Sequence, residues 1–255
     1  MVNLMSAAAR PARGFGGFIA LSAETLACLV RPPYAWRETL TQIAFVSKVS
    51  VLPALMLTIP YSIFSAFLLN ILLLEIGASD LSGSGQALVS VTQISPLVTA
   101  IVVAGTGAAA MCADLGSRTI REEIDAMKVI GVDPVQRLAL PRTIAATVVS
   151  LFLFALVAVS GLAGSYMFVV YVQHVTPGAF IAGLTLVVHL PEVVTSLIKA
   201  ALFGLSAGLI ACYKGFTVAR GPTGVGNAVN ETVVFSFMAL FTINILVTAV
   251  AVKVT

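Results

Sequence analysis

The chain has 255 residues, of which 59% are hydrophobic and only 10% are charged, and its formal net charge is +3. Soluble domains usually carry about 25% charged residues, so this composition excludes an ordinary soluble protein. Several separate apolar runs exceed the ~18 residues that suffice for a membrane-spanning helix. The basic residues form no patch interleaved with aromatic side chains, which excludes the usual nucleic-acid-binding surface. We therefore expect one polytopic, all-α membrane protein.

The N-terminal region combines a basic tail with an amphipathic stretch. Residues 1–13 are expected to be irregular, whereas residues 14–30 place apolar side chains, including Phe18, on one helical face with Glu24 off it. This pattern is typical of a helix that lies in the headgroup plane of a bilayer, although a soluble helix packed on protein shows it too. Two consecutive prolines then break the helix, and Trp36 beside a basic residue is typical of a membrane-interface anchor.

Five apolar segments are long enough to cross a bilayer. Their expected bounds are about 47–74, 87–113, 142–171, 193–212 and 229–252. Two prolines in the first segment predict a kink or an irregular start. In the fourth, Gly204 and Gly208 have the spacing that lets a neighbouring helix approach closely, either within the chain or across a dimer. Residues 178–190 are apolar but too short to cross, and we interpret them as an elbow or re-entrant piece.

The basic residues are distributed unevenly between the two sides that five spans define. Twelve of the fourteen Lys and Arg residues lie in segments on one side, which are residues 1–48, 114–142 and 214–226. The turns at 75–86 and 172–192 on the other side hold none. Because Lys and Arg concentrate in cytoplasmic segments of membrane proteins, we expect a cytoplasmic N-terminus and a C-terminus on the outer side.

The polar segment 114–142 interrupts the apolar pattern between the second and third spans. It holds five of the eleven acidic residues and five of the fourteen basic ones. Each charge would cost at least ~2.5–3.5 kcal/mol at the bilayer centre, so we expect this segment to lie in water. A short helix is predicted at about 117–131, with Asp114 or Ser117 as its N-cap and Gly131 as its C-terminal stop.

The two faces of this predicted helix differ. Ile120, Ile124 and Met127 share an apolar stripe, and the charged side chains point elsewhere. A short amphipathic helix at a membrane surface is either a solvated loop helix or a docking element for a soluble partner. Paired carboxylates for acid–base catalysis are a poor interpretation, because neither a histidine nor a nucleophile is near.

Four segments match a known sequence pattern. They are Glu122-Glu123-Ile-Asp125-Ala126-Met127 followed by Gly131-Val-Asp133-Pro134, the stretch from Asn70 through Asp80 to Gly85, Ile198-Lys199-Ala-Ala-Leu-Phe203-Gly204, and the stretch from Gly224 to Val234. Together they resemble the MlaE/YrbE family, the permease subunits of lipid-transporting ABC systems. The pattern is most similar to the A-type YrbE subunit of actinobacterial Mce lipid-uptake systems. The resemblance covers the chain from about residue 36 onward.

This resemblance implies an N-terminal interfacial region, residues 1–42, and a permease domain, residues 43–255, in the plasma (inner) membrane. It implies four kinds of partner: a second YrbE-type permease chain, a cytoplasmic dimer of ABC ATPases, Mce-domain proteins on the outer side, and a lipid substrate such as a fatty acid or sterol. ATP and Mg would be bound by the ATPase, because this chain has no Walker A motif. The expected direction of transport is import.

In the resembled family, the segment corresponding to 119–131 is the coupling helix that fits a groove on the ATPase. The residues that would make this contact are Glu122, Glu123, Asp125, Ala126, Met127 and Gly131. The acidic side chains would form ion pairs with the groove, while Ile124 and Met127 would bury apolar area in it. Gly131 would let the chain turn back toward the membrane.

Lys199 is the only unambiguous charge that the sequence places inside an expected span. Ionisable residues within membranes are candidates for function by default. The side chain either contacts an anionic lipid headgroup, or extends its ammonium toward the interface or pairs within the bundle. The three cysteines follow no metal-binding spacing and are interpreted as packing residues, and no metal or cofactor is expected in this chain.

Two other functions remain open. A secondary transporter driven by an ion gradient would need a carboxylate or a pair of unwound helices near the bilayer midplane, and no expected span carries a mid-depth carboxylate. A membrane scaffold that only recruits partners would tolerate polar substitutions along the expected cavity, whereas a permease would not.

Overall fold

The structure, a computed structural model, describes residues 2–30, 32, 35–78 and 81–254; the side chains of residues 2–13, 179, 185–187, 252 and 254 are not described. Asp80 of the matching segments and Arg31 of the expected helix break lie outside the described residues. All regular secondary structure in the described ranges is helical, as expected for an all-α membrane protein.

Ten α-helices and three π-helical segments cover most of the described chain. The α-helices are α1 (Val2–Cys28), α2 (Trp36–Glu75), α3 (Ser82–Val89), α4 (Ser95–Val102), α5 (Ala109–Ile120), α6 (Glu123–Val129), α7 (Leu140–Tyr171), α8 (Pro177–Val187), α9 (Leu190–Phe216) and α10 (Pro222–Val254). The π-helical segments are η2 (Ser90–Ile94), η3 (Val103–Ala108) and η4 (Val135–Ala139). Such segments are rare and often lie at functional sites, because the extra residue per turn redirects side chains.

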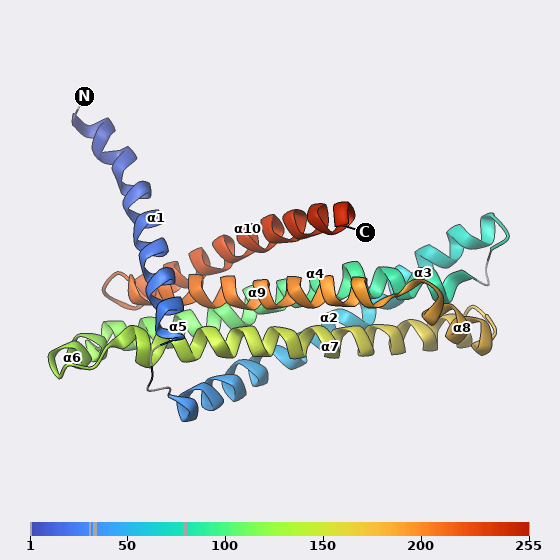
Figure 1. Cartoon of the computed structure of the whole chain (residues 1–255), viewed down its shortest axis with the longest axis horizontal. Coiled ribbons are helices and arrows are strands. Elements are labelled where there is room, and N and C mark those ends of the chain that lie inside the picture. The colour runs from blue at the N-terminus through green and yellow to red at the C-terminus, as the bar shows by residue number, and fades with distance from the viewer. Residues whose placement is uncertain (1, 31, 33–34, 79–80, 255) are drawn as a thin grey trace.

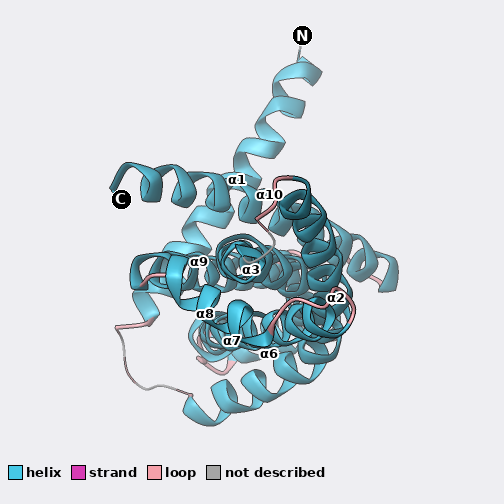
Figure 2. Ribbon diagram, turned by 90° about the vertical axis from the view of Figure 1, so that its right-hand side faces the viewer, coloured by secondary structure: helices cyan, strands magenta, loops and turns pink. Residues whose placement is uncertain are grey.

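Five helical stretches are long and apolar enough to cross a membrane, which confirms the expected number of spans. They are Trp36–Glu75, Ser82–Ile120, Val135–Tyr171, Leu190–Phe216 and Pro222–Ala251. They run side by side along the long axis of the molecule, with α6 at one end and α8 at the other (Figure 1). We call these the α6 end and the α8 end. Seen along the bundle, α1 and the C-terminal part of α10 extend away from the other helices (Figure 2).

The packed centre of the bundle is α7, with α2 on one side and α9 on another. The buried side of α2 carries a small or polar residue at almost every fourth position, from Ser50 through Thr58 to Asn70. Ser50 Oγ lies 3.2 Å from Thr106 Oγ1 of η3, within hydrogen-bonding distance. Small and hydroxyl side chains of this kind let membrane helices approach closely, where lipid gives no hydrophobic driving force between them.

The small residues of the fourth span serve packing within the chain. A Cβ atom on Gly204 of α9 would lie 2.5 Å from the Ala146 carbonyl oxygen of α7, and one on Gly208 would lie 3.1 Å from Thr143 Cα. Both glycines therefore face α7. The sequence left open whether these glycines pack within the chain or across a dimer, and the structure shows packing within the chain.

Several observed helix bounds differ from the expected ones. α1 begins at Val2, so the stretch expected to be an irregular tail is helical. α2 begins at Trp36, well before the expected start at residue 47, and it continues through both of its prolines. The predicted domain boundary after residue 42 lies inside this helix. These differences arise because hydropathy locates only the apolar part of a helix. The polar, amphipathic residues before the apolar part of α2 continue the same helix.

α1 crosses the α6 end of the bundle (Figure 1). Tyr213 of α9 donates a hydrogen bond of 2.8 Å to the Gly14 carbonyl oxygen, and its ring packs edge-to-face against Phe18. Phe18 therefore contacts protein, although the sequence placed it on a membrane-facing side. Phe15 and Ile19 are exposed, as that interpretation of α1 requires.

The stretch expected to be an elbow contains α8, which packs against α3 at the α8 end. Phe180 of α8 is buried in a cluster with Ala66 and Val169, and its ring meets Tyr166 edge-on. With 11 residues, α8 is too short to span a bilayer. The prediction of a short, non-spanning piece is confirmed.

Candidate functional site

The polar segment folds as the tip of a hairpin, in which α6 lies between α5 and α7 (Figure 1). The predicted single helix is divided, because residues 117–120 end α5 and α6 begins only at Glu123. Glu122 separates the two with a left-handed φ of 60° and is the N-cap of α6. The predicted caps are therefore wrong: Ser117 lies within α5 and its hydroxyl donates to the Asp114 carbonyl oxygen at 2.7 Å.

Gly131 ends α6 as predicted. Its φ is 79°, a left-handed conformation that costs other L-residues about 1–2 kcal/mol. The N–H groups of Gly131 and Val132 donate to the carbonyl oxygens of Lys128 and Met127 at 3.1 and 2.9 Å. This is a Schellman motif, which satisfies the last carbonyls of the helix and turns the chain back toward α7.

The inner face of α6 packs on the bundle. Ile124 is 5% exposed and Met127 is half-buried, and both join a cluster formed by Leu115, Leu138, Ala139 and Cys212. The sequence assigned Ile124 and Met127 to a groove on a partner protein. That assignment is wrong for Ile124, because the chain's own core covers it, whereas Met127 is partly exposed. As a result, α6 is seated firmly on the helices that surround it.

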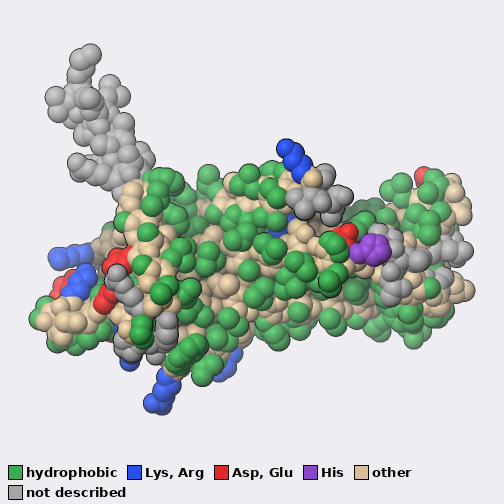
Figure 3. All heavy atoms as spheres, in the orientation of Figure 1, with side chains coloured by type: hydrophobic (Ala, Val, Ile, Leu, Met, Phe, Trp, Pro, Cys, Tyr) green, Lys and Arg blue, Asp and Glu red, His purple; other side chains and the backbone are tan. Residues whose placement is uncertain are grey.

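The opposite face of α6 is open. We define the α6 outer face as the exposed residues Glu122, Asp125, Ala126, Val129 and Ile130. Val129 and Ile130 are 87% and 74% exposed, which is unusual for large aliphatic side chains beside charged ones. Most charged side chains on the visible side of the molecule lie toward this end, whereas the middle is covered mainly by hydrophobic ones (Figure 3).

The acidic residues of α6 form only weak ion pairs within the chain. Asp125 pairs with Lys128 at 3.1 Å, and Glu123 pairs with Arg121 at 3.1 Å. All four side chains are substantially exposed, and pairs of this kind contribute at most about 1 kcal/mol. These carboxylates are therefore available to exchange their present partners for cations on another protein.

Arg142 is enclosed by the bundle, although the sequence placed the whole segment 114–142 in water, and its partner Asp114 is partly exposed at the bundle surface. Arg142 is 0% exposed; its Nη2 donates to Asp114 Oδ2 and its Nη1 donates to the Leu138 carbonyl oxygen at 3.0 Å. Arg118 Nε also reaches Asp114 Oδ1, at 3.5 Å. Sequence reasoning missed this pair because its members belong to different helices.

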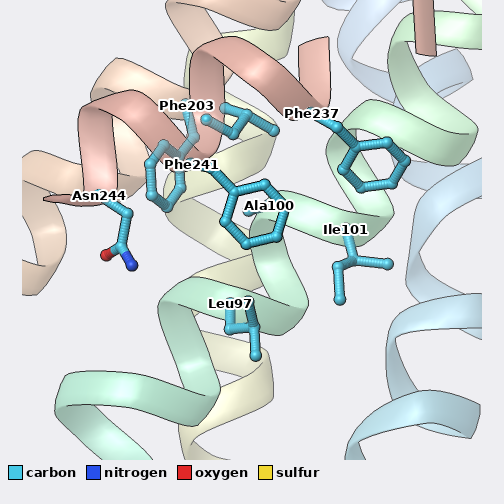
Figure 4. Close-up of a pocket in the computed structure, with 8 residues that line it drawn as sticks. Leu97, Ala100, Ile101, Phe203, Phe237, Phe241 and Asn244 are labelled. Carbon is cyan, nitrogen blue, oxygen red and sulfur yellow. The ribbon is translucent and has the colours of Figure 1, made fainter. Parts of the chain in front are cut away.

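Lys199 of α9 is 3% exposed. Its ammonium makes no ion pair or hydrogen bond with the residues that the structure describes. One helical turn later on the same face, Phe203 lines an apolar cleft between α4, α9 and α10 (Figure 4). The side chains around this cleft include those of Leu97, Ile101, Phe237, Phe241 and Asn244. The cleft is small and almost entirely apolar.

Comparison with known proteins assigns the chain to a family. The model of the family described as permease MlaE matches residues 39–250. This chain belongs to the MlaE permease family. Among its relatives, a Rickettsia typhi protein named "Probable ABC transporter permease protein" is 28% identical over 248 residues, which cover 95% of this chain and 94% of that protein.

Two further relatives match the MlaE permease over a shorter length. A Synechocystis protein with the same kind of name is 30% identical over 168 residues, covering 66% of this chain and 64% of that protein. The protein named TRIGALACTOSYLDIACYLGLYCEROL 1, chloroplastic, of Arabidopsis thaliana is 30% identical over 167 residues, covering 66% of this chain and 48% of that protein. An MlaE permease is the membrane subunit of an ABC-type transporter, which implies an ATPase partner.

The remaining polar and thiol groups of the MlaE permease lie apart from the α6 outer face. Within the described ranges, no three His, Cys, Asp or Glu side chains are grouped so as to hold a metal ion. All three cysteines are buried, and Cys212 Sγ lies 3.7 Å from the Ala139 carbonyl oxygen. His189 belongs to a capping box with Glu192 at the start of α9, which gives it a structural role.

Proposed function

We propose that this MlaE permease moves lipid across the plasma (inner) membrane, using ATP hydrolysed by a separate cytoplasmic ATPase dimer. The observation that carries the proposal is the geometry of α6: its inner face is fixed to the bundle and its outer face is open. The name of the Arabidopsis relative, which is that of a galactolipid, supports lipid as the transported class. The resemblance to Mce uptake systems supports import of a fatty acid, sterol or other lipid.

The proposal includes an orientation of the permease in the membrane and a set of protein partners. The α6 end faces the cytoplasm, as the excess of basic residues in its segments favours, and the C-terminus lies on the outer side. A second YrbE-type permease chain, the B-type sister of an A-type subunit, completes the lipid pathway. Mce-domain proteins meet the α8 end and exchange lipid there.

In this proposal, the ATPase grips the α6 outer face. Val129, Ile130 and the exposed part of Met127 supply the apolar anchors, in place of the buried Ile124. Glu122, Glu123 and Asp125 pair with cations of the groove, and Ala126 allows close approach. When the ATPase dimer closes, displacement of α6 reaches the spans as a rigid-body movement, because its inner face packs on α5, η4 and α9.

Reversing two charges on α6 tests this function. We expect Glu123→Arg together with Asp125→Arg to reduce copurification of the ATPase roughly tenfold or more, because like charges then face each other across the interface. The measurement is the amount of ATPase retained by the tagged permease in detergent, together with ATP turnover of the retained complex. Glu24→Arg is the matched control, since Glu24 is exposed on α1 at the same end of the bundle.

An unchanged complex with the double variant would contradict the assignment of α6 as the coupling element. Loss of the ATPase from both the double variant and the Glu24→Arg control would point to a general charge effect instead. Transport that persists without ATP hydrolysis, but stops when the proton gradient is collapsed, would replace the ABC mechanism with that of a secondary transporter.

We further propose that Lys199 contacts the anionic headgroup of the transported lipid. The support is a lysine that is only 3% exposed, has no counter-charge in the described residues and lies one helical turn from Phe203. A largely desolvated cation without a counter-charge is costly, and an anionic ligand would relieve that cost.

Neutralising this lysine tests the headgroup contact. We expect Lys199→Met to reduce ATP-driven movement of fluorescent phosphatidylglycerol roughly tenfold, which corresponds to about 1.4 kcal/mol. Movement of fluorescent phosphatidylcholine, whose headgroup has no net charge, should change much less. Lys199→Arg is the control because it keeps the charge. Equal losses for both lipids would indicate that Lys199 supports the structure and does not select the headgroup.

A further inference from the structure

We propose that Arg142 is a positioning residue that acts through Asp114 to tie α5 to α7, so that the two helices on either side of α6 move as one body. This inference rests on the proposed function, because only a helix that is displaced by a partner needs such a tie. It gives a role to a buried ion pair that docking of α6 does not by itself require.

The contacts of Arg142 fix it in both position and direction. One arm of the guanidinium binds the Asp114 carboxylate of α5, and the other donates to the Leu138 carbonyl oxygen at the entry to α7. Arg118 holds the second oxygen of Asp114 from the more exposed side. The planar, multi-donor group allows one arrangement, whereas an apolar contact of the same area would let the two helices slide.

The pair lies where movement of α6 enters the bundle. Asp114 belongs to the last turns of α5, and Arg142 belongs to the first turn of α7. Only residues 121–122 separate α5 from α6, and residues 130–134 lead from α6 to η4. The pair thus joins the two ends of the α5–α6–α7 hairpin, and it meets the cluster around Ile124 through the Leu138 carbonyl oxygen. In this inference, a displacement of α6 moves α5 and α7 together.

A second ion pair at the same end provides a matched comparison. Lys214 of α9 pairs with Glu231 of α10 and also lies 4.5 Å from the centre of the Phe235 ring. This pair also joins two spans, but neither α9 nor α10 directly precedes or follows the α5–α6–α7 hairpin in the sequence. If an ion pair serves only stability, removing either pair should have similar consequences for coupling.

The experiment uses the complete complex of the permease with its ATPase in vesicles of phosphatidylethanolamine and phosphatidylglycerol. The variants are Asp114→Leu with Arg142→Met, and, as control, Lys214→Met with Glu231→Leu. The measured quantity is fluorescent phosphatidylglycerol moved per ATP hydrolysed. We expect the first variant to lower this ratio roughly tenfold while ATP turnover continues, because the spans no longer follow α6 together. The control should keep the wild-type ratio.

A wild-type ratio in the Asp114–Arg142 variant would overturn the inference, as would an equal loss in the control. If the double variant does not accumulate in the membrane, Arg142→Lys decides: it keeps the charge but lacks the second arm, so a lowered ratio supports the tie and a wild-type ratio overturns it. A wild-type complex that hydrolyses ATP without moving lipid would instead contradict the proposed function, and the inference would fall with it.

Discussion

Replacing Asp114 alone by leucine is expected to destabilise the protein by about 3–5 kcal/mol, the usual cost of breaking a buried ion pair from one side. The cost is high because Arg142 is completely enclosed and would keep its charge without a counter-charge. Its Nε already lacks a hydrogen-bond partner among the described residues, so the guanidinium has no alternative acceptor to turn to. The measurement is the free energy of unfolding in detergent, for example by titration with a denaturing detergent.

Removing the arginine alone should cost less than removing the aspartate. In Arg142→Met, the Asp114 carboxylate keeps Arg118 as a partner. Its side chain is 31% exposed, so its charge is neither buried nor unpaired. The double variant should recover most of the stability, since an apolar pair of similar volume often replaces a buried ion pair without loss. As control, Arg118→Met should cost no more than about 1 kcal/mol, because that side chain is partly exposed. Equal losses for Asp114→Leu and Arg142→Met would contradict this asymmetry.

The spans and the C-terminal end of α6 were predictable because they depend on local sequence. Hydrophobic length alone identifies a spanning helix, and five were found where five were expected. Gly131 was predictable because only glycine adopts the left-handed conformation readily at a helix end. In both cases the physical cause lies within a few residues of the position concerned.

The parts that were not predicted depend on contacts between distant residues. The periodicity of α6 correctly gave it an apolar and a polar face, but it did not reveal that the chain's own core would cover Ile124. Similarly, nothing local to Arg142 indicates burial, since its counter-charge Asp114 lies at the opposite end of the polar segment. The break at Glu122 was missed because a glutamate at positive φ is rare and has no sequence signal.

A side chain at Gly204 is expected to destabilise the protein by forcing α7 and α9 apart. The Cβ atom of Gly204→Ala would lie 2.5 Å from the Ala146 carbonyl oxygen and 2.6 Å from Thr147 Cα. Both are backbone atoms of α7 and cannot rotate away, so the two helices must separate. Separation would also lengthen the 2.8 Å hydrogen bond that Ser150 donates to the Ala200 carbonyl oxygen. We expect Gly204→Ala to cost about 1–3 kcal/mol, the range for overpacking, and Gly204→Ile to cost more.

The chain offers a matched control for this prediction in Gly226 of α10, where an added Cβ would meet no atom within 4 Å. Because alanine favours the helix more than glycine does, Gly226→Ala should be neutral or stabilising by up to about 1 kcal/mol. The two substitutions make the same chemical change in two helices, so the difference between their unfolding free energies isolates the contact between α7 and α9. If Gly204→Ala were as stable as Gly226→Ala, the two helices would not approach this closely. The seating of α9, and with it the position of Lys199, would then need revision.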